Sequence, residues 1–179
     1  MCKYLHTESS ILYRAKGGDR MTDYEWMLTE AHDRGLTVKE IPFVFFDGLI
    51  KDDRIGIRKT IETEAEKADV LAEEVAHYDL TVGNILDQTD VNNRRQERKA
   101  RSQAYDMRIG INRIAEAIEM GCHNPYEAAE YLGVSEKFFC EALDYYKQKY
   151  GECVETDGYV LIFEPSVNII RNGQPNVPD

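Results

Sequence analysis

Helical and strand-like patterns of apolar residues alternate along most of the chain. Thr22 and Glu25 have the spacing of a capping box, and the apolar positions that follow recur with a helical period until Gly35. Residues 38–46 are rich in β-branched and aromatic side chains, which favours a strand. Because Pro42 lacks a backbone N–H, this segment is predicted to be an edge strand or a strand entrance.

A hairpin and a second helix are predicted next. Residues 48–51 and 54–57 have short apolar patterns and flank Asp52-Asp53, which indicates a short β-hairpin. A second capping box at residues 63–66 opens a helix that we expect to run to about residue 77 or 80. Gly83-Asn84 marks the expected break after this helix.

Residues 92–120 again have a helical pattern, which glycines at positions 110 and 121 interrupt. The first part is strongly charged, with basic residues that alternate with Glu97. This alternation predicts a solvated, salt-bridged face, and the alternative is a surface for nucleic acid or an acidic partner. The basic residues are Arg94, Arg95, Arg98, Lys99 and Arg101.

Residues 124–150 resemble a helix-turn-helix motif. Residues 124–127 form a third capping box with proline at the first helical position, Gly133 falls at the turn, and Ser135 caps the second helix. Such a module could read DNA, but the second helix carries acidic and basic residues together, so contacts with phosphates would be poor. We therefore interpret it as a packing or protein-recognition module.

Four segments are expected from these patterns. Lys-Gly-Gly-Asp before Met21 can be encoded by a bacterial ribosome-binding sequence, so residues 1–20 are expected to be a translated leader or a disordered arm. The main domain is predicted to span residues 21–120, with a helical module at 121–165 packed on it. That module ends in a short strand over residues 159–163, and a loose tail follows at residues 166–179.

Composition narrows the class of protein. The chain has 179 residues, 42% hydrophobic and 31% charged, which is an ordinary balance for a globular domain. It has a net charge of −11, which opposes non-specific binding to nucleic acid. We find no run of eighteen apolar residues and no secretory pattern. Its four scattered cysteines are expected to be reduced, buried thiols, so the sequence predicts a cytoplasmic protein.

The strongest chemical signal is the motif Glu73-Glu74-Val75-Ala76-His77 in the second long helix. Residues four apart share one helical face, so Glu73 and His77 project together and Glu74 can reach the same cleft. In the usual His-Glu-x-x-His helix, two histidines bind zinc and the glutamate is the general base. A carboxylate can also ligate zinc, although the extra negative charge makes metal-bound water less acidic.

The bare five residues would also suit a solvated acidic helix. A following helix makes a metal site the better interpretation of these residues, because Glu97 can supply a third ligand from a facing element. An oxygen-rich set of Glu73, His77 and Glu97 is less selective for zinc than two histidines, so manganese or iron would also suit it.

Residues 71–78 together with Glu97 and two alanines after it, Ala100 and Ala104, resemble the ImmA/IrrE family of metallopeptidases. The resemblance covers nearly all of residues 22–165 and is closest to short phage and mobile-element members with Glu-Glu-x-x-His. It implies a mainly helical α+β fold of the zincin type, with a small sheet and a C-terminal helix-turn-helix-like module. It also implies Glu73, His77 and Glu97 as metal ligands and Glu74 as general base.

Other residues offer competing roles. His32 or His123 could replace the missing imidazole, although a lone histidine is more often a surface or capping residue. Tyr78 or Tyr105 could donate a hydrogen bond to an oxyanion, but packing is the better default for both.

Three functions follow as hypotheses. The leading one is a zinc-dependent endopeptidase that cleaves a partner helix-turn-helix repressor of a phage or mobile element, as the resemblance implies. The alternative is a catalytically inactive family member that antagonises a repressor by binding it. A DNA-binding regulator that uses residues 124–150 is disfavoured by the acidic charge. No membrane partner is expected.

Overall fold

The computed structural model of the chain describes residues 3–4, 21–82, 90–156 and 158–172. It has the α+β class that the sequence predicts. The helices in the described part are α1 (Asp23–Asp33), α2 (Glu64–Val82), α3 (Asp90–Arg108), α4 (Gly110–Glu119), α5 (Pro125–Leu132) and α6 (Glu136–Tyr150). The strands are β1 (Lys3–Tyr4), β2 (Thr37–Ile41), β3 (Gly48–Lys51), β4 (Arg54–Arg58), β5 (Cys153–Glu155), β6 (Tyr159–Ile162) and β7 (Asn168–Arg171).

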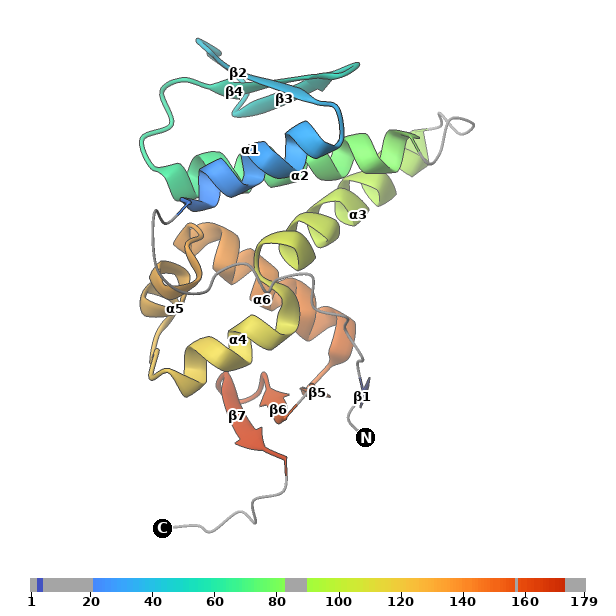
Figure 1. Cartoon of the computed structure of the whole chain (residues 1–179). Helices are drawn as coiled ribbons and strands as arrows, with labels where there is room; N and C mark the ends of the chain where they lie inside the picture. Colours follow the sequence, from blue (N-terminus) through green and yellow to red (C-terminus); the bar gives the residue numbers. More distant parts are fainter. Residues whose placement is uncertain (1–2, 5–20, 83–89, 157, 173–179) are drawn as a thin grey trace.

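A three-stranded sheet covers helices α1 and α2 at one end of the molecule (Figure 1). Its strand order is β2-β4-β3, with β2 parallel and β3 antiparallel to the central strand β4. Ile55 and Ile57 of β4 are fully buried and join Met27 and Leu71 in the core. This packing leaves β3 as an edge strand that contacts helix α2.

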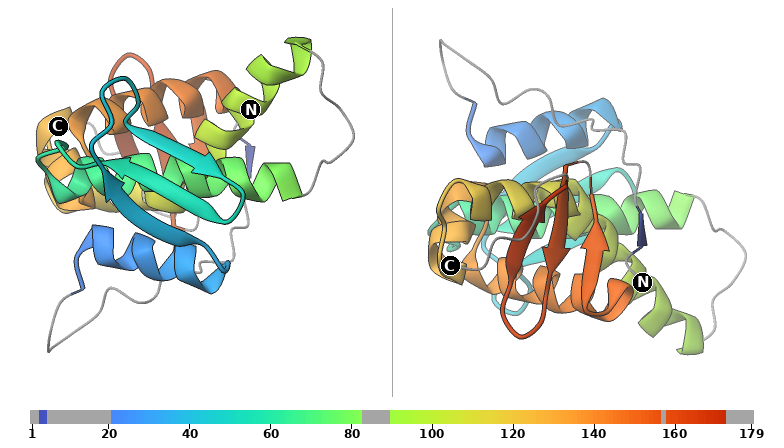
Figure 2. Two further views of the ribbon diagram at one scale, coloured as in Figure 1. Left: turned by 90° about the horizontal axis from the view of Figure 1, so that it is seen from above. Right: turned by 90° about the horizontal axis from the view of Figure 1, so that it is seen from below.

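Helices α2 and α3 pack against each other and lead into the second half of the molecule. There α4, α5 and α6 form a helical layer, and the sheet β1-β5-β6-β7 lies against it on the side away from the first sheet (Figures 1 and 2). Tyr146, Leu132 and Leu161 are fully buried and belong to the same continuous core. None of the helices in the described residues has the length and apolar run needed to cross a bilayer.

The local signals that predicted helix ends are confirmed. Thr22 accepts a hydrogen bond from the N–H of Glu25 as part of a full capping box, and Asn124 accepts one from Glu127. Gly133 has φ +69°, so a residue without a side chain suits the turn before α6. The predicted hairpin of β3 and β4 is confirmed, whereas the expected break at residues 83–84 lies outside the described residues.

Some strand predictions differ from the structure. The segment predicted as a strand to residue 46 ends at Ile41, because Pro42 follows, and Val44 and Phe45 are exposed. Strand β7 lies inside the tail that was expected to be loose, and β5 was not predicted. Cys140 is exposed and Cys153 is disulfide-bonded, so the expectation of four reduced, buried thiols is wrong for these two.

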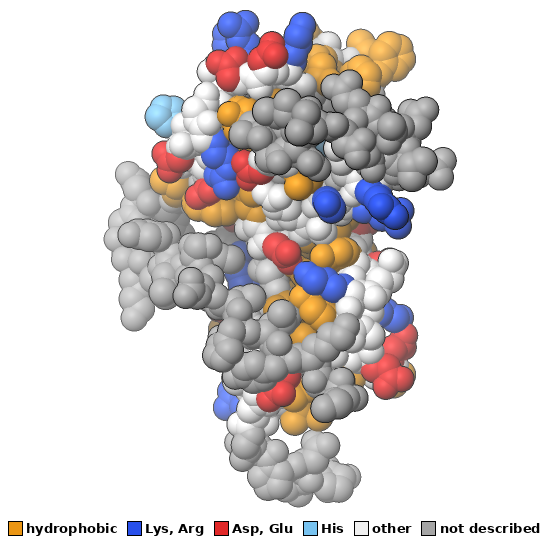
Figure 3. All heavy atoms as spheres, turned by 90° about the vertical axis from the view of Figure 1, so that its right-hand side faces the viewer, with side chains coloured by type: hydrophobic (Ala, Val, Ile, Leu, Met, Phe, Trp, Pro, Cys, Tyr) orange, Lys and Arg blue, Asp and Glu red, His pale blue; other side chains and the backbone are white. Residues whose placement is uncertain are grey.

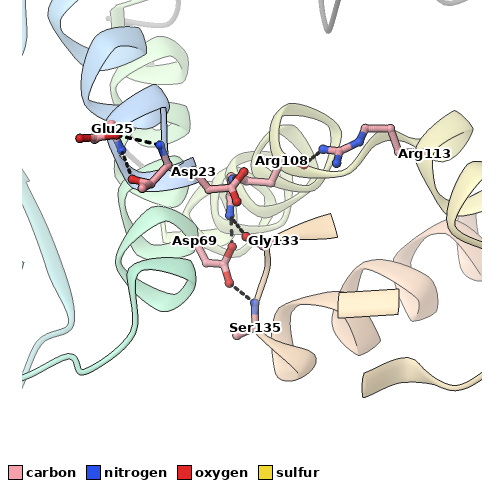
Figure 4. A network of polar contacts seen from close by, with 8 residues as sticks. Asp23, Glu25, Asp69, Arg108, Arg113, Gly133 and Ser135 are labelled. Carbon is pink, nitrogen blue, oxygen red and sulfur yellow. Dashed lines mark hydrogen bonds and ion pairs between the residues drawn. The ribbon is translucent and has the colours of Figure 1, made fainter. Parts of the chain in front are cut away.

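A buried ion-pair network joins the motif helix to the turn between α5 and α6 (Figure 4). The Arg108 Nε lies 3.1 Å from Asp69 Oδ1, and its Nη2 donates to the Gly133 carbonyl at 2.5 Å. Asp69 Oδ2 accepts the Ser135 N–H at 2.8 Å. Because Asp69 lies one helical turn before Glu73, this network fixes the orientation of the motif helix against α6.

Candidate functional site

Helices α2 and α3 bring the motif and Glu97 together. His77 Nε2 lies 3.4 Å from Glu97 Oε2, although the two residues are separated by a connection outside the described residues. Both side chains are partly exposed. The sequence-based prediction that a following helix supplies a carboxylate next to His77 therefore agrees with the geometry.

Arg101 completes a chain of charges on α3. Its Nε lies 3.1 Å from Glu97 Oε1, so the two oxygens of this carboxylate face two different partners, Arg101 and His77. The two α3 residues are four apart and therefore lie on one helical face. The pair is half exposed, as the alternating charges of this segment predicted.

Glu73 is a partly buried carboxyl in a crowded electrostatic setting. Burial raises its pKa, the positive charge of Arg101 opposes this, and the negative charges of Glu97 and Glu141 raise the pKa further. Glu141 belongs to α6, so a charge from the helix-turn-helix-like segment also acts on this carboxyl. Three helices therefore contribute charge around Glu73.

Glu74 lies beneath the edge strand β3. It accepts a hydrogen bond from the Ile50 N–H, and the backbone of Gly48 passes so close that a Cβ there would lie 2.6 Å from Glu74 Oε1. Burial, together with the negative charges of Glu73 and Glu97, raises the pKa of Glu74 to about 7. A carboxyl with this pKa can both accept and return a proton near neutral pH.

The donor set partly fits a divalent metal. Two tetrahedral ligands, each about 2.0–2.2 Å from zinc, lie about 3.3–3.5 Å apart, and the His77–Glu97 separation of 3.4 Å matches this spacing. Glu73 is close enough to Glu97 for their charges to interact. Yet among the residues that the structure describes, no three His, Cys, Asp or Glu side chains are already grouped as a metal would need. A third ligand would have to move into place.

The predicted tyrosines have different surroundings. Tyr105 is buried, its ring packs edge-on against Phe138 with centroids 5.1 Å apart, and its hydroxyl donates to Glu141 Oε2 at 3.4 Å. Burial and the charge of Glu141 raise the pKa of Tyr105. Tyr78 is partly buried and packs against the core. These contacts favour the packing role that the sequence suggested for both.

The two other histidines considered as metal ligands, His32 and His123, lie in exposed positions. His32 is 87% exposed on α1 and lies 3.9 Å from its neighbour Asp33. His123 is exposed, and its backbone N–H donates to Glu127. Neither contact connects these histidines to Glu73 or His77, so the structure gives no support to their replacing the missing imidazole.

Sequence reasoning missed two participants. Arg101 was assigned to a solvated face and Glu141 to a recognition helix, yet both act on Glu73. Arg101 could have been found from its spacing, because it lies four residues after Glu97 and therefore on the same helical face. The influence of Glu141 depends on the tertiary placement of α6 near α2, which no local pattern contains.

The chain matches no protein-family model and no curated protein. The resemblance to ImmA/IrrE metallopeptidases therefore stays a prediction that depends on the motif and its geometry.

Proposed function

We propose that this protein is a metal-dependent endopeptidase of the zincin type. Glu73, His77 and Glu97 would hold the metal, zinc in the first instance with manganese or iron as alternatives, and Glu74 would be the general base. The bound metal would supply Lewis-acid polarisation of the scissile carbonyl. The observation that carries the proposal is the 3.4 Å approach of His77 Nε2 on α2 to Glu97 Oε2 on α3, about one helical turn from the partly buried Glu74 carboxyl.

The role of Glu74 follows from its surroundings. A general base is most effective when its pKa lies near the working pH, because it is then ionised often enough and still holds a transferred proton. The Ile50 N–H holds the carboxylate and β3 covers it, which together fix its orientation. Glu74 would take a proton from the attacking water and deliver it to the leaving amine.

The edge strand supports a polypeptide substrate. β3 is the outer strand of its sheet and lies directly over Glu74. An extended peptide can align along such an edge by main-chain hydrogen bonds. From the family resemblance, the substrate would be a helix-turn-helix repressor, with the α5–α6 segment as a docking module and no direct contact with nucleic acid. Charges of both signs are interspersed on the face shown in Figure 3, which suits a protein partner better than DNA.

The test is a comparison of new peptide N-termini. The protein, loaded with zinc, is incubated with a host protein extract, and the new N-termini are labelled and sequenced, with Glu74→Gln as the matched control. The proposal expects a small set of cleavages that Glu74→Gln abolishes while its metal content is unchanged. Equal cleavage by both proteins would remove Glu74 from the role of base.

A second candidate function is a non-catalytic, repressor-binding protein. The ion pair between Arg101 and Glu97 favours it, because a carboxylate already neutralised by a guanidinium is less available to a metal. This alternative predicts a stable complex with the repressor, no cleavage, and no effect of Glu74→Gln on binding.

A further inference from the structure

The sheet β2-β4-β3 has an outer face that points away from helix α2. A Cβ on Gly48 would lie 2.6 Å from Glu74 Oε1 of α2, so Leu49, the next residue of β3, points to the opposite side of the sheet. Seen from that side, the three strands lie in front of the helices (Figure 2). The outer face is therefore separated by the sheet itself from the candidate site around Glu74.

Apolar side chains occupy the centre of this outer face. Leu49 is exposed and pairs with Gly56 of β4, where a Cβ would lie 2.8 Å from the Phe43 ring and 2.9 Å from Ile41 Cδ1. The segment after Phe43 exposes three more large apolar residues, and Figure 3 shows hydrophobic side chains gathered at this end of the molecule. They are Val44, Phe45 and Phe46. Contiguous exposed groups of this kind mark interaction surfaces.

Basic side chains surround the apolar centre. Residues that pair across strands point to the same side of a sheet, so the register shows which ones share this face. Lys39 and Leu49 both pair with Gly56, and Lys51 pairs with Arg54. The charged residues at the strand positions of the outer face are all basic: Lys39, Lys51, Arg54 and Arg58.

The acidic residues nearest to this face lie outside its paired positions. Asp47 forms an ion pair with Arg58, and Asp53 lies 3.8 Å from the Arg54 guanidinium. Asp52 belongs to the hairpin turn. The two lysines of the outer face form no ion pair with another described residue. The face therefore offers positive charge around an apolar centre, in a protein with a net charge of −11.

We propose that this outer face binds an amphipathic helix of a partner protein, with acidic side chains on either side of its apolar stripe. A sheet face with an apolar centre is normally buried against a second layer, and α1 and α2 lie only on the inner face (Figure 1). Three strands span about 10 Å, which is about the diameter of a helix. The inference does not depend on the proposed metal site.

Charge distinguishes this occupant from the others. A second copy in a two-fold contact would bring the same lysines, Lys39 and Lys51, toward each other. Nucleic acid and anionic membranes carry dense negative charge, which a protein with a net charge of −11 repels. A helix with a few acidic residues needs only the local positive charge of this face.

The experiment uses two synthetic fluorescent helical peptides with the same leucine stripe, which glutamates flank in one and lysines in the other. Binding to the full chain is measured by fluorescence anisotropy. Wild type should bind the glutamate peptide at least about tenfold more tightly than the lysine peptide. Phe45→Ser should weaken that binding by about tenfold, since Phe45 is 89% exposed and available for contact. The control Met120→Ser, at a residue 66% exposed after α4, should have no effect.

A second pair of variants tests the charges. Replacement of Lys39 and Lys51 by glutamine should weaken binding of the glutamate peptide by about fivefold. The matched control replaces Lys99 and Lys137, which are exposed on α3 and α6, and should stay within about twofold of wild type. Circular dichroism verifies that each variant is folded.

Several results would overturn the inference. They are no binding of either peptide, equal binding of both, or binding that Phe45→Ser leaves unchanged. A wild-type dimer in sedimentation that Phe45→Ser dissociates would identify a second copy as the occupant instead. Binding to anionic vesicles or to single-stranded DNA that Phe45→Ser abolishes would likewise replace the helix by a membrane or a nucleic acid. Loss of the proposed peptidase activity alone would leave the inference intact.

Discussion

Arg108 offers the most quantitative test of how the two halves of the molecule are joined. It is 2% exposed, and its guanidinium contacts Asp69 on α2, Asp23 at the start of α1 and the Gly133 carbonyl (Figure 4). Replacement by methionine keeps most of the side-chain volume and removes the charge. Asp69, 5% exposed, would then keep its hydrogen bonds from Ser135 but lose its charged partner.

The expected loss follows from the buried carboxylate. Removing one partner of a buried ion pair costs about 3–5 kcal/mol, because the remaining charge is left without compensation. The contact with Asp23 is 3.5 Å long and less buried, so it should add little. We therefore expect Arg108→Met to lower the free energy of unfolding by about 3–5 kcal/mol.

The assay is equilibrium unfolding in urea, followed by circular dichroism. Arg54→Met is the control, since that side chain is 82% exposed and should change stability by less than about 0.5 kcal/mol. The double replacement Arg108→Met with Asp69→Leu should recover part of the loss, because no unpaired charge then remains. A loss below about 1 kcal/mol for Arg108→Met, or a fully additive double variant, would refute the reasoning.

Three further predictions concern the site. Gly48→Ala should displace the Glu74 carboxyl, since the new Cβ would lie 2.6 Å from Glu74 Oε1, and we expect a stability loss of about 1–3 kcal/mol with reduced cleavage; unchanged stability and cleavage would contradict this close approach. In the metal-free protein, the raised pKa of Glu74 means that the folded state binds more protons than the unfolded state between pH 4.5, the ordinary pKa of a glutamate, and about pH 7. The free energy of unfolding should therefore fall as pH rises through that range, by at most about 3 kcal/mol relative to Glu74→Gln, and parallel pH profiles for the two proteins would be inconsistent with it. Tyr105→Phe should leave cleavage within about threefold of wild type, because its hydroxyl donates to Glu141 and therefore is not placed for an oxyanion; a hundredfold loss would restore the oxyanion role.

Local chemistry explains which parts of the fold were predictable. Thr22, Asn124 and Ser135 satisfy helix N-termini with their own side chains, so each cap depends only on residues three positions away. The hairpin of β3 and β4 similarly depends on a tight turn at Asp52, which has φ +55°. Strands β5 and β7 have three and four residues, and their pairing partners lie outside their own segments, so their short patterns gave no clear signal.

In the candidate site, too, some features follow from local spacing and others depend on tertiary contacts. Glu73 and His77 share a helical face because of their spacing alone, and Glu74 lies one residue round from them. Glu97 was expected from a following helix. Which oxygen of Glu97 faces which partner depends on how α2 and α3 pack. The position of β3 over Glu74 is likewise a tertiary contact that the sequence pattern does not contain. The same holds for the burial that raises the pKa of this carboxyl.

The most direct test of the metal-site proposal is the metal content of the purified protein, measured by mass spectrometry of the elements. The proposal predicts about one equivalent of a transition metal in wild type after incubation with zinc. His77→Ala and Glu97→Ala should each lose it, whereas Glu74→Gln should keep it. Less than a tenth of an equivalent in wild type, unaffected by His77→Ala, would contradict the metallopeptidase and favour the repressor-binding protein.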